Sequence, residues 1–197
     1  MADARQRPYK QVARAEAQQR TRDALLEAAD EEFVKDGLTT SLESLAARAG
    51  VTKQTVLRHF GSKEGLIDAV LRRTSEIVRR ENVQASPGDI QEAVSSLMRH
   101  YERYGDVVML MLAEERRIPF VRRVANHGRD AHYEWVAQTF KPQLAGLRGD
   151  TRERRLAQLV AVCDVYVWKL LRRDLQLSVT ETEAAVIELI EGLQERK

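Results

Sequence analysis

Three of the four histidines, the single cysteine and one neighbouring acid are the residues of this chain that could act as nucleophiles, bases or metal ligands. They are His100, His127, His132, Cys163 and Asp164. His127 and His132 are five residues apart, which places them about 140° apart around a helix rather than on one face. The sequence contains no Gly-x-Ser-x-Gly, His-Glu-x-x-His or phosphate-cradling loop. We therefore expect no enzyme, no metal site and no cofactor.

A second group of polar side chains is spaced for binding. The segment 53–60 is predicted to be a short helix, and it presents hydrogen-bond donors that can reach base edges or phosphates in a DNA major groove. These donors are Lys53, Gln54, Thr55, Arg58 and His59. Thr52 caps this helix, whose amino terminus also favours a phosphate. The pattern taken alone fits equally a plain helical hairpin with a solvated polar face.

The residues before this segment have the types that a helix-turn-helix needs. Thr40 and Glu43 form a capping box that predicts a helix over 41–49. Ala46 is small where two helices must touch, and Gly50, four residues later, tolerates the positive φ of the turn. The buried seam is expected to consist of Leu45, Ala49, Val51 and Val56.

The surrounding sequence extends this pattern in register over several helices. The residues that carry it are Ala28-Ala29, Phe33, Gly37, Thr40-Ser41-Leu42, the run Leu45 to Lys53, Thr55, His59-Phe60 and Ser62 to Leu66. With them, the stretch 20–70 closely resembles the tetracycline-repressor (TetR) family of bacterial regulators. The family usually has a tyrosine where this chain has Leu57, so one phosphate contact is expected to be missing or supplied by Arg58 or Thr55.

The resemblance implies which residues lie at or near DNA. These are Ser41, Thr52, Lys53, Gln54, Thr55, His59 and Lys63. Gln54 and Lys53 are the candidates for reading bases, and the others position the protein on the duplex. Arg58, on the same helix, completes the expected DNA-binding set.

The whole chain is predicted to be all-α, because no stretch keeps the period-two alternation of a strand. Helices are expected over 18–36, 41–49, 53–60, from Ser62 to about Arg80, and over 89–104, 106–117, 119–140, 151–173 and 181–194. The expected organisation is a basic amino-terminal arm (1–17), a three-helix helix-turn-helix domain (18–65) and a helical ligand-sensing and dimerisation domain (66–197). The second capping box is expected at Ser178 with Glu181, or at Thr180 with Glu183.

Charge and composition bound the partners and the compartment. The formal net charge is +2, and the basic arm is either a flexible segment that enters a minor groove or a disordered solubilising tail. A single cysteine excludes an internal disulfide and suits the cytoplasm. The longest apolar run, Val107 to Ala113, is too short to cross a bilayer, so no membrane partner is expected.

The carboxy-terminal helices are expected to form a homodimer. A single helix-turn-helix contacts little DNA, so two reading helices about 34 Å apart on a palindromic duplex operator are expected. The helices 151–173 and 181–194 carry apolar residues on more than one stripe, including Val162, Tyr166 and Trp168. In the TetR family the last two helices commonly form the dimer interface. The alternative is that both helices pack only into their own subunit.

A small-molecule effector is expected in the same part of the chain. The middle helices are rich in aromatic residues and methionine, which line adaptable apolar pockets. The residues predicted to contact a ligand are Tyr101, Met109, Trp135 and Tyr166. At helical spacing such residues more often belong to an ordinary core, and residue by residue that alternative is the stronger one. The resulting hypothesis is a homodimeric repressor released from its operator by a small apolar or aromatic ligand. A ligand-independent or partner-controlled regulator, or an activator, is the alternative.

Overall fold

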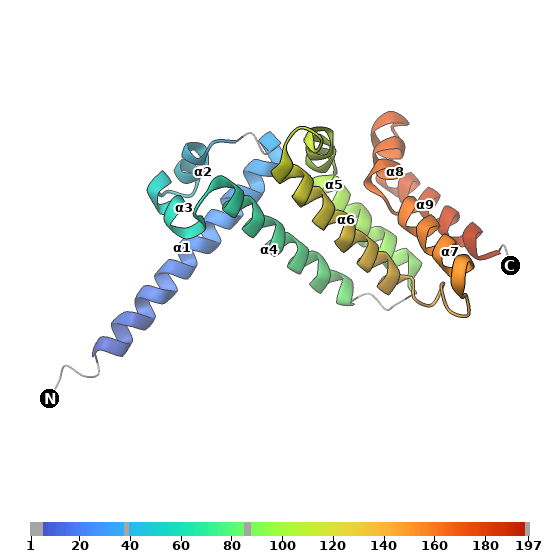
Figure 1. Ribbon diagram of the computed structural model, residues 1–197, viewed down its shortest axis with the longest axis horizontal. Coiled ribbons are helices and arrows are strands. Elements are labelled where there is room, and N and C mark those ends of the chain that lie inside the picture. The colour runs from blue at the N-terminus through green and yellow to red at the C-terminus, as the bar shows by residue number, and fades with distance from the viewer. Residues whose placement is uncertain (1–5, 38–39, 85–87, 196–197) are drawn as a thin grey trace. The chain divides into compact units, whose positions relative to one another are not determined.

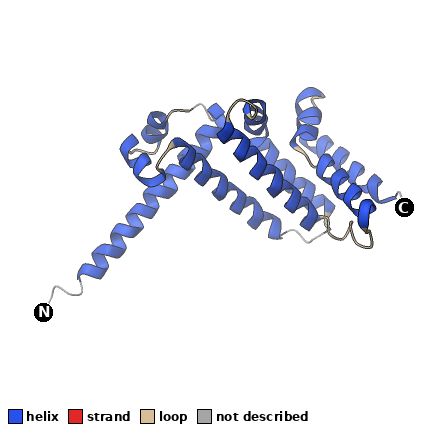
Figure 2. Cartoon of the chain, in the orientation of Figure 1, coloured by secondary structure: helices blue, strands red, loops and turns tan. Residues whose placement is uncertain are grey.

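The computed structural model of the chain describes residues 6–37, 40–84 and 88–195. Helices account for the regular structure in these ranges, and no strand occurs in them (Figure 2). The prediction of an all-α fold is therefore confirmed. The chain divides into two compact units, Met1–Arg73 and Thr74–Lys197, and the boundary between them falls within the residues of helix α4. Each unit is described separately.

The first unit contains α1 (Gln6–Asp36), α2 (Leu42–Arg48), α3 (Lys53–Phe60) and the start of α4 (Lys63–Gln84) (Figure 1). Helix α1 packs on α2, and α2 packs on α3. All four helices supply its buried apolar residues, which are Leu25, Leu26, Ala28, Ala29, Phe33, Leu45, Ala46, Val56, Leu66, Ile67, Ala69 and Val70. These side chains recur at three- and four-residue spacing, so each helix turns one apolar stripe inward.

Helix α1 begins twelve residues earlier than the sequence pattern predicted, at Gln6 rather than Gln18. Residues 6–17 therefore continue the helix instead of forming a flexible arm, while residues 1–5 lie outside the described part. The early start has a local reason. Pro8 falls in the first turn, where its missing N–H is not needed, and the alanine, arginine, glutamine and glutamate residues that follow are strong helix formers.

The second unit consists of α5 (Ile90–Glu114), α6 (Pro119–Thr139), α7 (Gly149–Val162), α8 (Val165–Lys169), a π-helical turn (Leu170–Asp174) and α9 (Val179–Glu195). Helix α5 packs against α6, α8 and α9, and α7 packs against α6 and α9 (Figure 1). The residues fully enclosed between these helices include Val94, Met98, Val136, Phe140, Leu159, Trp168, Val186 and Ile190.

Helix α5 runs without interruption through Gly105, where two separate helices had been predicted. This glycine is buried beneath the indole of Trp168. A Cβ atom at position 105 would lie 2.4 Å from Cζ3 of Trp168, so the residue permits close packing rather than ending a helix.

The predicted helix 151–173 is broken at Cys163 and Asp164 into α7, α8 and the π-helical turn. The Asp164 side chain accepts a hydrogen bond from the backbone N–H of Tyr166 at 3.0 Å and so caps α8. The carbonyl of Cys163, which no longer has a helical partner, accepts a hydrogen bond from the Tyr101 hydroxyl at 3.0 Å. Tertiary contacts thus compensate for the break.

Helix α9 starts with the capping box predicted at Ser178 and Glu181. The N–H of Ser178 donates to the Glu181 carboxylate at 2.8 Å, and the N–H of Glu181 donates to the Ser178 hydroxyl at 3.2 Å. Two backbone donors are satisfied reciprocally, as the motif requires.

None of the helices in the described ranges is long and apolar enough to span a membrane.

Candidate nucleic-acid interface

The turn between α2 and α3 has the geometry of a helix-turn-helix. Gly50 adopts φ +65°, a left-handed conformation that costs other L-residues energy. The backbone N–H of Gly50 donates to the carbonyl of Ala47 at 3.1 Å, and that of Val51 donates to the carbonyl of Ala46 at 2.9 Å. These bonds satisfy the carbonyls at the end of α2 and turn the chain into α3.

The seam beneath the turn is apolar. Leu45 and Val56 are fully buried, Ala46 is nearly so, and the other two seam residues predicted from sequence, Ala49 and Val51, are half-buried. A larger side chain than Ala46 would separate α2 from α3, because the two helices touch there. The seam therefore fixes the orientation of α3 and leaves its opposite face outward.

Helix α2 is capped by Ser41 and not by the predicted Thr40. The Ser41 hydroxyl accepts a hydrogen bond from the N–H of Ser44 at 3.1 Å, whereas the Thr40 hydroxyl donates to the carbonyl of Gly37 at 3.4 Å. The predicted capping box was thus wrong by one residue. Glu43, its expected acidic member, instead pairs with the reading helix.

Helix α3 begins and ends at the predicted residues, 53 and 60. Thr52 caps it by accepting a hydrogen bond from the N–H of Thr55 at 3.2 Å. The predicted DNA-binding residues lie in this unit, on α3, at the two caps and in the first turn of α4. Ser41, Thr52, Lys53, Gln54 and Arg58 are exposed, and Thr55, His59 and Lys63 are half-buried.

Lys53, at the start of α3, has an ion-pair partner. Its ammonium group lies 2.6 Å from the Glu43 carboxylate in the first turn of α2. The hydrogen bond from Lys53 lowers the pKa of Glu43. A residue predicted to read bases is therefore held by an acid that sequence reasoning had assigned to a helix cap.

Arg22 of α1 contacts the carboxy-terminal end of α3. Its guanidinium donates to the carbonyl of His59 at 3.3 Å, and its Cζ atom lies 4.6 Å from the ring centroid of Phe60. Burial, followed by the charges of Arg58 and Arg22, lowers the pKa of His59. No local sequence pattern predicts this role of Arg22, because the contact spans 37 residues.

A further arginine ties α2 to α1. The guanidinium of Arg48 donates to the carboxylate of Glu32, which is buried, at 2.8 Å, and it also pairs with Glu31. Arg22 and Arg48 thus brace the helix-turn-helix at both of its helices. A charge-assisted pair at a partly buried carboxylate contributes more than an exposed one.

The predicted ligand-binding residues are not all gathered in one place. Tyr101 is buried, Met109 and Trp135 are partly buried against the core of the second unit, and Tyr166 is 55% exposed. The hydroxyl of Tyr101 is already used by the carbonyl of Cys163. Tyr166 therefore lies on the surface of the unit, whereas the other three residues are buried or partly buried.

His132, which the sequence pattern did not assign to a ligand site, lies beside Trp135. The rings of His132 and Trp135 stack with centroids 6.0 Å apart, and Phe140 meets Trp135 edge-on at 6.1 Å. Burial, followed by the nearby charge of His132, lowers the pKa of His100 to about 4. Nδ1 of His100 and Nε1 of Trp135 are buried without a hydrogen-bond partner among the described residues.

No group of three or more histidine, cysteine, aspartate or glutamate side chains suited to a metal ion occurs in the part of the chain that the structure describes.

Known proteins resemble this chain over the segment that carries the helix-turn-helix. Residues 25–70 match the family model described as bacterial regulatory proteins, tetR family. The HTH-type transcriptional repressor Rv3405c of Mycobacterium tuberculosis is 35% identical over 92 residues, which are 46% of this chain and 46% of that protein. The chain thus spans about half the length of the curated relatives it matches.

Solved structures share the fold over most of the chain. A transcriptional-regulator structure from Saccharomonospora viridis in complex with choline aligns with a TM-score of 0.71 at 20% identity, covering 88% of this chain and 96% of that one. GusR of Salmonella enterica aligns with a TM-score of 0.66 at 20% identity, covering 89% and 95%. The matched segment contains the Gly50 turn, the Thr52 cap and the outward face of α3, and over residues 25–70 the chain is similar to the tetR family of bacterial regulatory proteins.

Proposed function

We propose that the protein is a sequence-specific DNA-binding transcriptional regulator that acts as a homodimeric repressor in the cytoplasm. One observation carries the proposal: α3 is fixed by its buried Val56 and the Gly50 turn, so that Lys53, Gln54 and Arg58 face outward on one short helix. A short helix held in this way can enter the major groove of duplex DNA and bring donors to base edges.

The exposed residues divide into two roles. Gln54 and Lys53 stand at the first turn of α3, where side chains of a reading helix reach bases. The remaining residues contact phosphates and set the register of the protein on the duplex, and they are Ser41, Thr52, Thr55, Arg58, His59 and Lys63. The amino termini of α2 and α3 add backbone donors to this phosphate-binding surface.

Dimerisation pairs two such helices on a palindromic operator. Exposed apolar residues on α8, on the π-helical turn, directly after that turn and on α9 support a self-association surface on the second unit, and they are Tyr166, Leu170, Leu175, Val179 and Leu189. Leu159 of α7 and Ile190 of α9 are fully buried in their own subunit, as is Trp168, which the sequence pattern had placed at the interface. A charge at Leu175, rather than at Leu159 or Ile190, is therefore the change that tests the interface.

The proposed effector site lies in the second unit around Trp135, which packs against the core and contacts the rings of His132 and Phe140. Native proteins rarely leave buried polar atoms unpaired, and the indole N–H of Trp135 can only donate. A small aromatic or apolar ligand with one oxygen acceptor meets that requirement. The Saccharomonospora viridis structure of the same fold was solved with a small ligand, choline.

Release from the operator follows if the ligand binds more tightly to the dimer whose reading helices are wrongly spaced. The coupling needs no contact between ligand and DNA. It requires only that the ligand discriminate between two arrangements of the dimer.

A reporter experiment tests the proposed function. A duplex selected by the protein from random sequence is placed over a bacterial promoter, and the chain is expressed alongside it. We expect reporter output to fall with the wild-type chain and to recover with Arg58→Ala, while Arg152→Ala on the exposed side of α7 serves as the matched control. A rise in output identifies an activator, and an unchanged output contradicts the proposal.

A further inference from the structure

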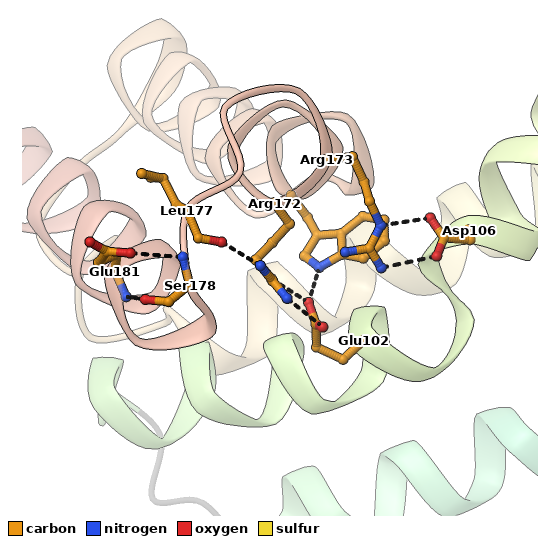
Figure 3. A network of polar contacts seen from close by, with 8 residues as sticks. Glu102, Asp106, Arg172, Arg173, Leu177, Ser178 and Glu181 are labelled. Atoms are coloured by element: carbon orange, nitrogen blue, oxygen red, sulfur yellow. Dashed lines mark hydrogen bonds and ion pairs between the residues drawn. The ribbon is translucent and has the colours of Figure 1, made fainter.

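Two acids of α5 hold two consecutive arginines of the π-helical turn (Figure 3). The carboxylate of Glu102 accepts hydrogen bonds from Nε of Arg172 at 2.7 Å and from its Nη2 at 3.0 Å, and also from Nε1 of Trp168 at 2.8 Å. Both oxygens of this partly buried acid are therefore used. Arg172 and Glu102 thus form a bidentate arginine–carboxylate pair, a geometry that makes such contacts strong.

The second arginine repeats the arrangement one turn along. Arg173 donates to both oxygens of Asp106, at 3.0 and 2.9 Å. Its Cζ atom also lies 4.4 Å from the ring of Trp168. Arg172 reaches in the other direction and donates to the carbonyl of Leu177, just before the Ser178 cap of α9 (Figure 3). The contacts thus link α5, α8 and the start of α9.

The segment held by these contacts has an unfavourable backbone. Its hydrogen bonds include one from the N–H of Leu175 to the carbonyl of Leu170 at 2.9 Å, a π-type spacing that is rare and concentrated at functional positions. Gln176 adopts φ +58° without being a glycine. Such conformations cost energy and persist where the surrounding structure enforces them.

The same segment displays large apolar side chains. Leu170 is 49% exposed and Leu175 is 58% exposed, and both belong to the surface assigned above to self-association. The polar contacts lie on the inner side of the turn and the leucines on its outer side. Loosening the acid–arginine contacts would free the segment to shift, and its exposed leucines with it, while leaving every apolar side chain present.

We propose that the Glu102–Arg172 pair is a positioning device for dimerisation: by fixing the π-helical turn on α5, it sets the placement of Leu170 and Leu175 for a second copy of this chain. The inference rests on the proposed homodimer. Glu102 and Arg172 act through the turn and are positioning residues rather than interface residues. Because they are partly buried, removing one leaves the other without its counter-charge.

Sedimentation equilibrium of the full-length chain tests this inference. Glu102→Gln keeps the side-chain shape and an oxygen for Trp168 but removes the charge that holds Arg172. We expect the dimer dissociation constant to rise at least about tenfold, with the helix content by circular dichroism unchanged. The matched control is Glu92→Gln, which breaks an exposed pair with Arg99 on the same helix and should leave the dissociation constant unchanged.

Two further variants keep the test decisive. Asp106→Asn loosens only the more exposed Arg173 contact and should raise the dissociation constant by a smaller factor. This variant provides the test if Glu102→Gln folds poorly. Combining Glu102→Gln with Arg172→Gln should raise it by less than the product of the single effects, because the two residues act as one pair.

The outcomes separate this inference from the one on which it depends. A wild-type chain that remains monomeric at every concentration contradicts the homodimer. A wild-type dimer whose dissociation constant is the same in Glu102→Gln, even if that variant unfolds more easily, shows a structural brace only and overturns the positioning role.

Discussion

At the scale of single residues, Glu43 pairs with Lys53. In the proposed complex its carboxylate therefore competes with DNA for the Lys53 ammonium group. Lys53 must leave a carboxylate at 2.6 Å before it can contact a duplex. Glu43→Gln should therefore tighten binding to any duplex severalfold and steepen the dependence of log affinity on log salt by about one, because one more cation is available to DNA. Fluorescence anisotropy over a salt series measures both quantities. Glu114→Gln, which breaks a pair with Arg117 in the second unit, is the control, and identical slopes for the two variants would show that Lys53 is not at the DNA.

Gln54 and Lys63 separate base reading from phosphate binding. The exposed amide of Gln54 can pair with an adenine edge, so Gln54→Ala should change which operator bases are preferred. Lys63→Ala should weaken binding to all duplexes alike and make the salt dependence shallower, because it removes a phosphate contact. Competition gel shifts with single-base operator variants measure the difference. An unaltered base preference in Gln54→Ala would contradict the reading role.

At the scale of elements, Gly105 determines how closely α5 and α8 approach. A Cβ atom at this position would lie 2.4 Å from the Trp168 ring, so Gly105→Ala should lower the free energy of unfolding by about 1–3 kcal/mol in spite of its better helix propensity. Gly128→Ala is the control: it lies in α6 with nothing within 4 Å of the added carbon and should raise stability by up to about 1 kcal/mol. Urea unfolding measures both, and equal effects of the two substitutions would refute the close-packing role.

His100 makes the packing of α5 against its neighbours depend on pH. Its pKa is lowered from 6.5 to about 4 by burial and then by His132, so between these values the unfolded chain binds more protons. The free energy of unfolding therefore has its full value above pH 6.5 and decreases as the pH falls, by about 2 kcal/mol at pH 5. Urea unfolding at pH 7.5 and pH 5 should show this loss reduced in His100→Phe, which keeps a ring among the neighbouring tyrosines. The same loss in both proteins would exclude His100 as its source.

The elements that could be predicted from sequence are those specified by neighbouring residues. Gly50, Ala46 and Thr52 are local signals, and α3 has the predicted bounds. Helix α5 and the break at Cys163 could not be predicted, because they depend on contacts across more than 60 residues, from Gly105 to Trp168 and from Tyr101 to the Cys163 carbonyl. Glu43 was misassigned for a similar reason. Its partner lies on the next helix.

At the scale of the whole molecule, the two units carry different parts of the proposed function. In the proposal the first unit presents α3 to DNA. The second unit buries a core while leaving apolar side chains exposed on α8, along and just after the π-helical turn, and on α9. Sequence patterning predicted a dimer interface on these last helices but could not separate core from surface on them, since both faces are apolar. Burial makes that separation: Leu159 and Ile190 lie inside, and Leu170 and Leu175 lie outside.

The central claim is that α3 of two symmetry-related copies reads duplex DNA. Selection from a random duplex library with the purified full-length chain, at moderate salt and with excess nonspecific competitor, tests it most directly. We expect enrichment of a two-fold symmetric sequence whose half-sites are one helical turn, about 34 Å, or a multiple of it apart. Recovery of no sequence above the random background would contradict the account.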